Sequence, residues 1–324
     1  MLLASHDNNK TLMQFQYIIN TYSQIYRHTI ETIPYKDMPK HMESNILISY
    51  GTNIPPWQGK QIHIYESEFF GEGYLTQKSL PDTPLPRYKD LPVLYLGGEQ
   101  KEPFVYRNGD IIETNIDLIA SSFFLLTRYE EVVNDDPTLL DNHERFPATA
   151  SIAYKEKFLH RPLVNEYFEL LWNCIKELNP NLEKKPLWDG KNFALCLTHD
   201  VDAVQKYKPL SEALAIGWLL LRQHSLKKAT ARFIDNIMVA LQKKNDPFDT
   251  FDMILNLERR YGATSTFFFM AAPDYSGGYC LDNSKVKNAI NQVSASGAEI
   301  GLHTGYYSYN NLEIISRQKE NLTK

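Results

Sequence analysis

Residues 193–202, FALCLTHDVD, decide the fold of the second half of the chain. Their first five positions form a continuous apolar run, which is typical of a strand buried on both faces of a parallel sheet. Two similar apolar runs follow, TSTFFFM at 264–270 and AEIGL at 298–302. Helical periodicity separates the runs, over residues 210–241, 251–259 and 284–296. Buried strands that alternate with helices predict βα units and a parallel sheet.

The residues before this stretch show a different pattern. Short runs rich in β-branched and aromatic residues, bounded by Gly, Pro or Asn, predict strands at 45–49, 61–65 and 91–96. Helical periodicity appears over 11–26, 117–133 and 163–178. We therefore expect an N-terminal α+β domain over residues 1–185. The Pro, Gly and charged residues of 179–190 (NPNLEKKPLWDG) indicate a domain boundary, after which a second domain occupies 192–324.

Composition excludes several classes of protein. The 324 residues are 43% hydrophobic and 12% aromatic, which suits a folded core and argues against disorder. A net charge of −5 gives no basic footprint for nucleic acid. Neither a secretory signal nor an apolar run of about 18 residues is found, so we expect a cytoplasmic protein without a transmembrane segment. The three cysteines, Cys174, Cys196 and Cys280, are scattered and are expected to be reduced core residues.

Polar side chains stand where two of the predicted strands end. Asp200 and Asp202 follow the first strand two positions apart, so they face the same way at its carboxyl end. His303 follows the third strand and is expected at the same edge of the sheet. One carboxylate could hold a metal ion while the other accepts a proton, and an imidazole beside a carboxylate suits Zn²⁺. Asp is also common in helix caps and turns, so these residues alone leave a structural interpretation open.

Three motifs in this order resemble the polysaccharide deacetylase (NodB-homology) family: THDVD at 198–202, GATSTFFFM at 262–270 and EIGLHTGYYS at 299–308. The match is to the branch with an HDVD-type first motif. The resemblance implies a distorted (β/α) barrel and metal-dependent removal of N- or O-acyl groups from sugars. It covers residues 192–324, which supply three strands of a barrel that usually has seven. We therefore expect an α/β protein whose N-terminal α+β domain precedes a partial (β/α) deacetylase-type barrel.

The resemblance also implies roles for individual residues. Asp200 matches the catalytic base, and His303 matches the first metal-binding His. Asp202 falls one position later than the usual metal-binding carboxylate, because Val201 occupies that place, and is the expected second ligand of a divalent metal, for which Zn²⁺ is the expected ion. Thr304 matches the Ser or Thr that follows the first metal-binding His. Tyr307 stands where a second metal-binding His is usual, which leaves a third ligand unassigned. We expect Thr304 and Tyr307 to contact the substrate.

The function implied is hydrolysis of a carbon–nitrogen bond other than a peptide bond, in an acylated carbohydrate. Two alternatives stay open: an inactive glycan-binding or scaffold relative, and a cyclic-amide hydrolase on the same fold. The family's later motifs, with its oxyanion Arg and general-acid His, are not found before Lys324. We therefore expect a fragment or a truncated relative that is nearly inactive by itself.

The N-terminal part resembles the domain of unknown function that precedes HDVD-type deacetylase domains in Bacteroidota-like proteins. The motifs are DLIASSFFLLTRYE at 117–130, RFPA at 145–148 and RPLVNEY at 161–167. Four charged residues in them could form an interdomain or substrate-facing polar set, although local salt bridges or caps are the simpler interpretation: Arg128, Glu130, Arg145 and Arg161.

One further segment, 213–232, is apolar and then basic. The run ALAIGWLLL at 213–221 precedes five basic or His side chains, which would allow contact with a membrane surface that carries a lipid-linked sugar. The preferred alternative is an inserted helix that packs on the barrel or on the N-terminal domain.

Overall fold

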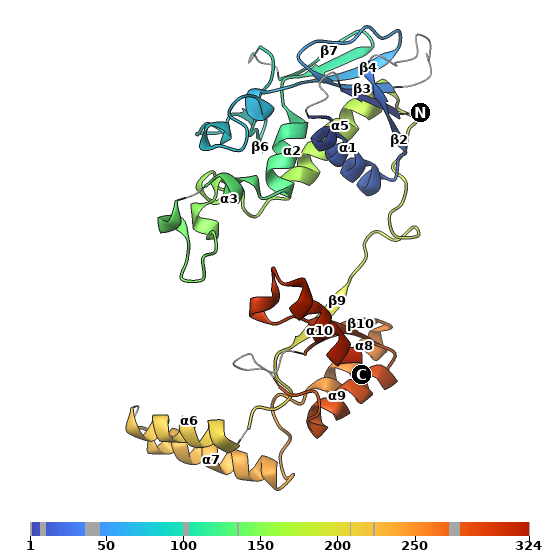
Figure 1. The fold of residues 1–324 in the computed structure, drawn as a ribbon. Coiled ribbons are helices and arrows are strands. Elements are labelled where there is room, and N and C mark those ends of the chain that lie inside the picture. The colour runs from blue at the N-terminus through green and yellow to red at the C-terminus, as the bar shows by residue number, and fades with distance from the viewer. Residues whose placement is uncertain are drawn as a thin grey trace. The chain divides into compact units, whose positions relative to one another are not determined.

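Helices and strands alternate along both halves of the chain in the computed structural model, so the protein is a mixed α/β protein (Figure 1). The structure describes residues 2–6, 11–35, 46–99, 104–134, 136–207, 209–222, 224–271 and 279–323. The chain divides into two compact units, residues 1–193 and 194–324. This division follows directly after 179–192, where the sequence predicts a boundary.

The N-terminal unit is built on a six-stranded sheet with the order β2-β1-β3-β4-β8-β7. All neighbouring strands are parallel except β7 and β8. The strands of an α+β domain are usually antiparallel, so this unit differs from the expected class. The strand bounds are β1 Leu2–His6, β2 Ile30–Pro34, β3 Ile46–Gly51, β4 Lys60–Tyr65, β7 Val105–Asn108 and β8 Ile111–Thr114. β1 and β2 were not predicted from the sequence, and Asn45 of the first predicted strand lies outside the described residues.

Three helices pack against this sheet and form the core of the unit. They are α1 Leu12–Tyr26, α2 Leu118–Leu126 and α5 Leu163–Leu178. The single helix predicted over 117–133 is wrong, because Arg128 adopts a left-handed φ of 53° and separates α2 from α3 Tyr129–Val133. The predicted strand 91–96 is reduced to β6 Leu91–Pro92, which pairs with β5 Arg87–Tyr88. Shorter elements are α4 Ile152–Lys155, η2 Glu68–Phe70, η3 Gln77–Ser79, η4 Pro137–Leu139 and η5 Ala148–Ala150.

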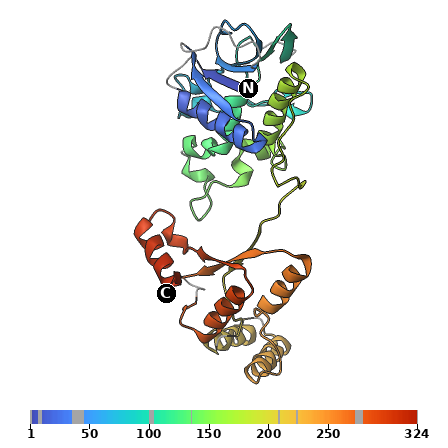
Figure 2. The same ribbon diagram turned by 90° about the vertical axis from the view of Figure 1, so that its right-hand side faces the viewer.

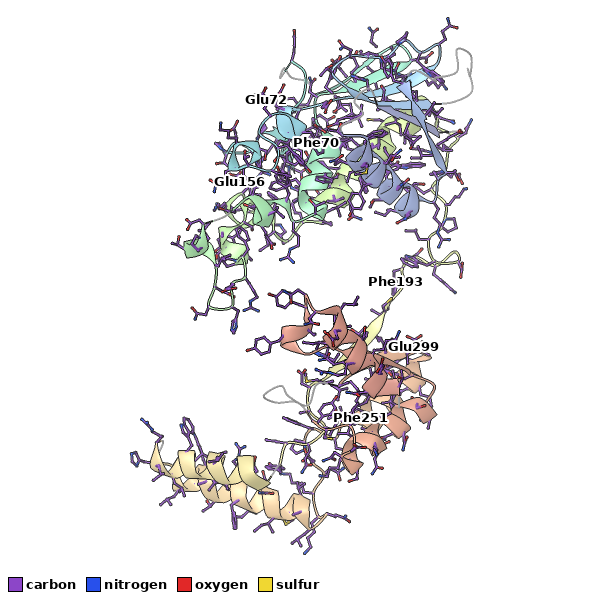
Figure 3. All side chains as sticks on the ribbon, in the orientation of Figure 1. Phe70, Glu72, Glu156, Phe193, Phe251 and Glu299 are labelled. Carbon is purple, nitrogen blue, oxygen red and sulfur yellow. The ribbon has the colours of Figure 1, made fainter. Side chains whose placement is uncertain are left out.

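The C-terminal unit contains a parallel three-stranded sheet with the order β11-β10-β9. β10 (Ser265–Met270) and β11 (Glu299–His303) confirm the predicted second and third strands. The prediction for 193–197 is wrong: Phe193, labelled in Figure 3, and Leu195 are exposed, and β9 spans Leu197–Val201. Apolar composition indicated burial there, but β9 pairs through the polar motif itself. Within the described residues, β9 and β11 are edge strands, and the sheet does not close into a barrel.

Two helices cover one face of this sheet. Phe251 and Leu255 of α8 (Phe251–Tyr261) pack on the buried rings of Phe267 and Phe269. α9 (Ser284–Ala295) adds buried valines to the same cluster. The opposite face carries the partly exposed Phe268 and is not buried as the apolar runs predicted. After β11 come the short turn η6 Tyr306–Ser308 and the helix α10 Leu312–Thr323.

The long helix predicted over 210–241 is two helices. α6 (Pro209–Leu221) and α7 (Leu226–Ala240) pack on each other as a hairpin, and His224 in the turn has a left-handed φ of 48°. No helix among the described residues combines the length and the apolarity needed to cross a bilayer. The three cysteines are free, but only Cys174 is buried, so the prediction of a core position is wrong for Cys196 and Cys280.

Candidate functional site

The candidate site lies where the strands of the C-terminal sheet end. Because β9, β10 and β11 are parallel and in register, Phe268 is paired with Asp200 on one side and Gly301 on the other, and Met270 is paired with His303. Residues paired in this way share a face of the sheet. The face of the sheet opposite α8 and α9, which also carries Phe268, therefore carries Asp200 and His303 at its carboxyl edge. Asp202 lies one residue beyond the end of β9.

The structure brings together the two aspartates and the histidine that the sequence selected. His303 Nε2 lies 3.7 Å from Asp200 Oδ2 and 3.7 Å from Asp202 Oδ1. The other ring nitrogen, Nδ1, lies 3.1 Å from the carbonyl oxygen of Thr304. When Nδ1 donates a proton to that carbonyl, Nε2 presents a lone pair to two carboxylates. A proton or a cation between these three groups would offset the repulsion of their lone pairs and charges.

These donor atoms are of the types that bind small divalent cations in proteins. Zn²⁺ binds imidazole nitrogen and carboxylate oxygen at about 2.0–2.2 Å, so two donors that share one ion are separated by roughly 3–4 Å. The contacts of 3.7 Å fall within this separation. The carbonyl of Thr304 behind the imidazole is the kind of partner that orients a metal-binding His. Among the described residues, however, no group of three or more His, Cys, Asp or Glu side chains is arranged so that it could hold a metal ion, and this includes Asp200, Asp202 and His303.

Tyr279 joins the ends of two strands next to this cluster. Its buried hydroxyl donates to the carbonyl of Val201 at 2.7 Å and accepts from the backbone N–H of Met270 at 2.8 Å. Burial, with a smaller contribution from the negative charge of Asp202, raises the pKa of Tyr279 to about 12. Val201 stands between the two aspartates, and Met270 is paired with His303. Tyr279 is therefore a positioning residue, which the sequence analysis missed because it follows no motif.

His199, inside the THDVD motif, faces the other way. Its Nε2 lies 2.7 Å from Glu258 Oε1, and the same buried carboxylate accepts from Ser265 Oγ at 2.8 Å. The imidazole also packs on Phe267, with the ring centres 4.5 Å apart. This network ties β9 and β10 to α8, so His199 holds the strand that carries the site and does not enter the site itself.

Gly301 has a steric role beside the cluster. A Cβ atom on this residue would lie 2.4 Å from Cδ1 and 2.5 Å from Cε1 of Phe268. Real contacts of this kind do not come below 3.0 Å, so the Phe268 ring can lie across β11 only because residue 301 is glycine. Packing of the Phe268 ring therefore requires glycine at this position of the EIGLH motif, two residues before His303.

The two residues expected to contact substrate lie just beyond the cluster. Thr304 has an exposed side chain and meets His303 through its carbonyl. Tyr307, in η6, is 75% exposed. The turn that carries them is held by α10, because the buried side chain of Gln318 accepts from the N–H of Gly305. Tyr279 also lines a cavity of about 600 Å³, together with Ala271, Asp282, Lys287, Ile290 and Leu322 among others.

The four charged residues selected in the N-terminal unit have local partners. Arg128 pairs with Glu131, Arg145 with Asp141, and Arg161 with Glu166, all at 2.5–2.8 Å. Glu130 accepts from the backbone N–H of Ile152 at the start of α4. The simpler interpretation as salt bridges and a cap is confirmed.

Comparisons with known proteins bear on the N-terminal unit. The model of a family of unknown function, DUF7033, matches residues 2–180, which is more than half of the chain. No curated protein and no solved structure gives a significant match. The match spans the N-terminal sheet and the helices that pack on it, and it stops before β9. The chain belongs to the family of unknown function DUF7033.

Proposed function

We propose that the C-terminal unit is the water-activating part of a metal-dependent hydrolase that removes an acyl group from a sugar nitrogen, as in the polysaccharide deacetylases. The observation that carries the proposal is the convergence of Asp200, Asp202 and His303, which come from two strands about 100 residues apart in sequence. The parallel order of β9, β10 and β11 also agrees with part of a (β/α) barrel.

Each side chain has a role that its position supports. Asp202 and His303 would hold a divalent ion, which when bound would polarise the acyl carbonyl and acidify the attacking water. Asp200, whose Oδ2 also lies 3.7 Å from His303 Nε2, would accept the proton of that water. The hydrogen bond at Nδ1 fixes the orientation of the imidazole, and Tyr279 fixes the backbone between the two aspartates. Both aspartates are exposed, so substrate and water can reach them.

Metal binding tests the first half of the proposal. The full chain is titrated with Zn²⁺ by calorimetry, alongside His303→Ala, Asp202→Asn and the control Asp282→Asn, an exposed aspartate of the same unit that pairs with Lys287. We expect one Zn²⁺ per chain, at least a tenfold weaker affinity in the two site variants and no change in the control. Equal binding by all four proteins would show that the ion is not held here.

Acetate release tests the second half. The zinc-loaded chain and its Asp200→Asn variant are incubated with N-acetylated chitooligosaccharides and, separately, with a cyclic ureide. We expect slow acetate release that Asp200→Asn abolishes while zinc affinity is kept. Release that is unchanged in Asp200→Asn would refute the assigned base. Zinc binding with hydrolysis of the ureide alone would favour a cyclic-amide hydrolase, and binding of the oligosaccharide without hydrolysis would favour an inactive relative.

A further inference from the structure

We propose that the hairpin α6–α7 is a docking surface for an anionic lipid bilayer. The two helices pack on each other, and among the described residues neither makes an extensive contact with another helix or with the sheet of its unit. Figures 1 and 2 show the hairpin projecting from the sheet and from α8 and α9. This inference goes beyond the proposed function and does not depend on it.

The hairpin is held together by its own charges. Arg232 of α7 donates two hydrogen bonds of 2.7 Å to the carboxylate of Glu212 on α6, which is buried. At the base, the buried carboxylate of Asp246 accepts from the backbone N–H groups of Lys206 and Tyr207. The chain just before α6 and the chain just after α7 are thereby joined to each other. A bidentate pair of this kind gives a defined geometry, so the hairpin can present a fixed surface.

The surface that it presents is apolar. On α6, Leu214, Trp218 and Leu221 recur at helical spacing and are all exposed. On α7, exposed apolar side chains recur in the same way, at Leu226, Phe233, Ile234 and Ile237, and Leu241 follows directly after the helix. Figure 3 shows side chains projecting along the whole hairpin. At the tip, Leu221 is 78% exposed and Leu226 is 72% exposed, which is unusual for two large apolar side chains so close in sequence.

Charge selects the partner. Residues 209–244 contain six Lys or Arg and two acids, whereas the whole chain has a net charge of −5. Both acids are already paired, Glu212 with Arg232 and Asp235 with Lys244. Three exposed cations flank Leu221 and Leu226 at the tip, and within the described residues they have no ion-pair partner. They are Arg222, Lys227 and Lys228.

Apolar side chains with adjacent Lys and Arg are the signature of helices that lie in the headgroup region of a bilayer. The long basic side chains reach lipid phosphates while the leucines and the indole enter the acyl boundary. A second copy of the hairpin is a poorer partner, because symmetric pairing would bring two surfaces with the same excess of positive charge together. An anionic bilayer supplies both the apolar layer and the opposite charge.

Vesicle sedimentation of the full chain tests the inference. Large vesicles of phosphatidylcholine alone and with 30% phosphatidylglycerol are compared at about 0.1 M and 0.5 M NaCl. We expect binding to the anionic vesicles, at least a tenfold weaker apparent affinity at the higher salt and little binding to neutral vesicles. Equal binding to both vesicles, or no binding to either, would overturn the proposal.

Paired variants locate the surface. Lys227→Glu/Lys228→Glu and Leu221→Ser/Leu226→Ser are each expected to weaken binding at least tenfold. The control Lys285→Glu/Lys319→Glu makes the same charge change at exposed positions on α9 and α10. It is expected to bind anionic vesicles nearly as well as the unaltered chain, with only the small loss that any added negative charge causes. Circular dichroism checks that every variant keeps the helix content of the unaltered chain. Equal losses in all charge variants would overturn the assignment to the hairpin. So would a dimer in sedimentation equilibrium that the Leu→Ser pair dissociates while lipid binding is kept.

Discussion

Replacing Tyr279 by Phe removes one oxygen atom and leaves the shape of the side chain intact. That oxygen makes hydrogen bonds of 2.7 and 2.8 Å to two backbone groups at the ends of β9 and β10. Each lost hydrogen bond costs about 1 kcal/mol net, and a buried polar group that is left without a partner costs about 1–3 kcal/mol. Some of the loss is recovered if water enters. We therefore expect Tyr279→Phe to lower the free energy of unfolding of the C-terminal unit by about 2–4 kcal/mol.

Tyr207→Phe is the matched control. This tyrosine is also buried in the C-terminal unit, but among the described residues its hydroxyl bonds to Asp235 alone, at 3.5 Å. A contact of that length is weak, so we expect a loss below about 1 kcal/mol.

Urea unfolding of the full chain measures both free energies, and hydrogen exchange at the Met270 amide reports the lost bond locally. In Tyr279→Phe that amide is expected to exchange faster while amides of the N-terminal sheet are unchanged. Equal stability losses in the two variants, or unchanged exchange at Met270, would refute the bridging role of Tyr279. A weaker affinity for Zn²⁺ in Tyr279→Phe than in Tyr207→Phe would further show that the bridge positions the aspartates.

Three other perturbations have defined outcomes. Gly301→Ala should destabilise the C-terminal unit by about 1–3 kcal/mol through the clash with Phe268, measured by thermal unfolding. The loss should be largely absent when Phe268 is also replaced by Ala. A Gly301→Ala variant that is more stable than the unaltered chain would disprove the clash. Arg232→Met should lower the melting temperature of the hairpin, because it leaves the carboxylate of Glu212 buried and unpaired. The double variant Glu212→Leu/Arg232→Met should recover much of the lost melting temperature. An unchanged melting temperature in the single variant would contradict the pairing. Burial lowers the pKa of His63 to about 4, so between pH 6.5 and 4 the unfolded chain binds a proton that the folded chain does not. The N-terminal unit should therefore lose up to about 3 kcal/mol as the pH falls through that range, and His63→Gln, followed by urea unfolding at pH 7 and pH 4.5, should reduce this dependence.

The meeting of the candidate site residues was predictable because it depends on one rule. Parallel strands end at the same edge of a sheet, so Asp200 and His303 were expected at one edge once β9 and β11 both paired with β10. Tyr279 could not be predicted in the same way. Its hydroxyl bonds to Val201, which is 78 residues earlier, and neither residue carries a local signal for that contact.

Helices and strands were predictable where a local pattern and its boundaries agreed. α5 has apolar residues at helical spacing between Pro162 and Asn179, and its predicted bounds are confirmed. The apolar run 193–197 had no such support, because a strand also needs a partner, and β10 pairs with 197–201 instead. The turn between α6 and α7 was missed since no Gly or Pro marks it; the chain reverses at a left-handed His224.

The closure of the hairpin by Asp246 has a consequence for how this chain can vary. Because the carboxylate of Asp246 binds the backbone of Lys206 and Tyr207, the segment between them begins and ends at one point of the fold. Joining two ends that already meet costs little additional chain entropy, and that cost grows only slowly with the length of the segment. Insertions and deletions of whole helical turns in α6 and α7 would then change the reach of the tip and leave α8 and the strand ends at Asp200 and His303 undisturbed. The fold thus separates a part that can change length from a part whose geometry must be kept.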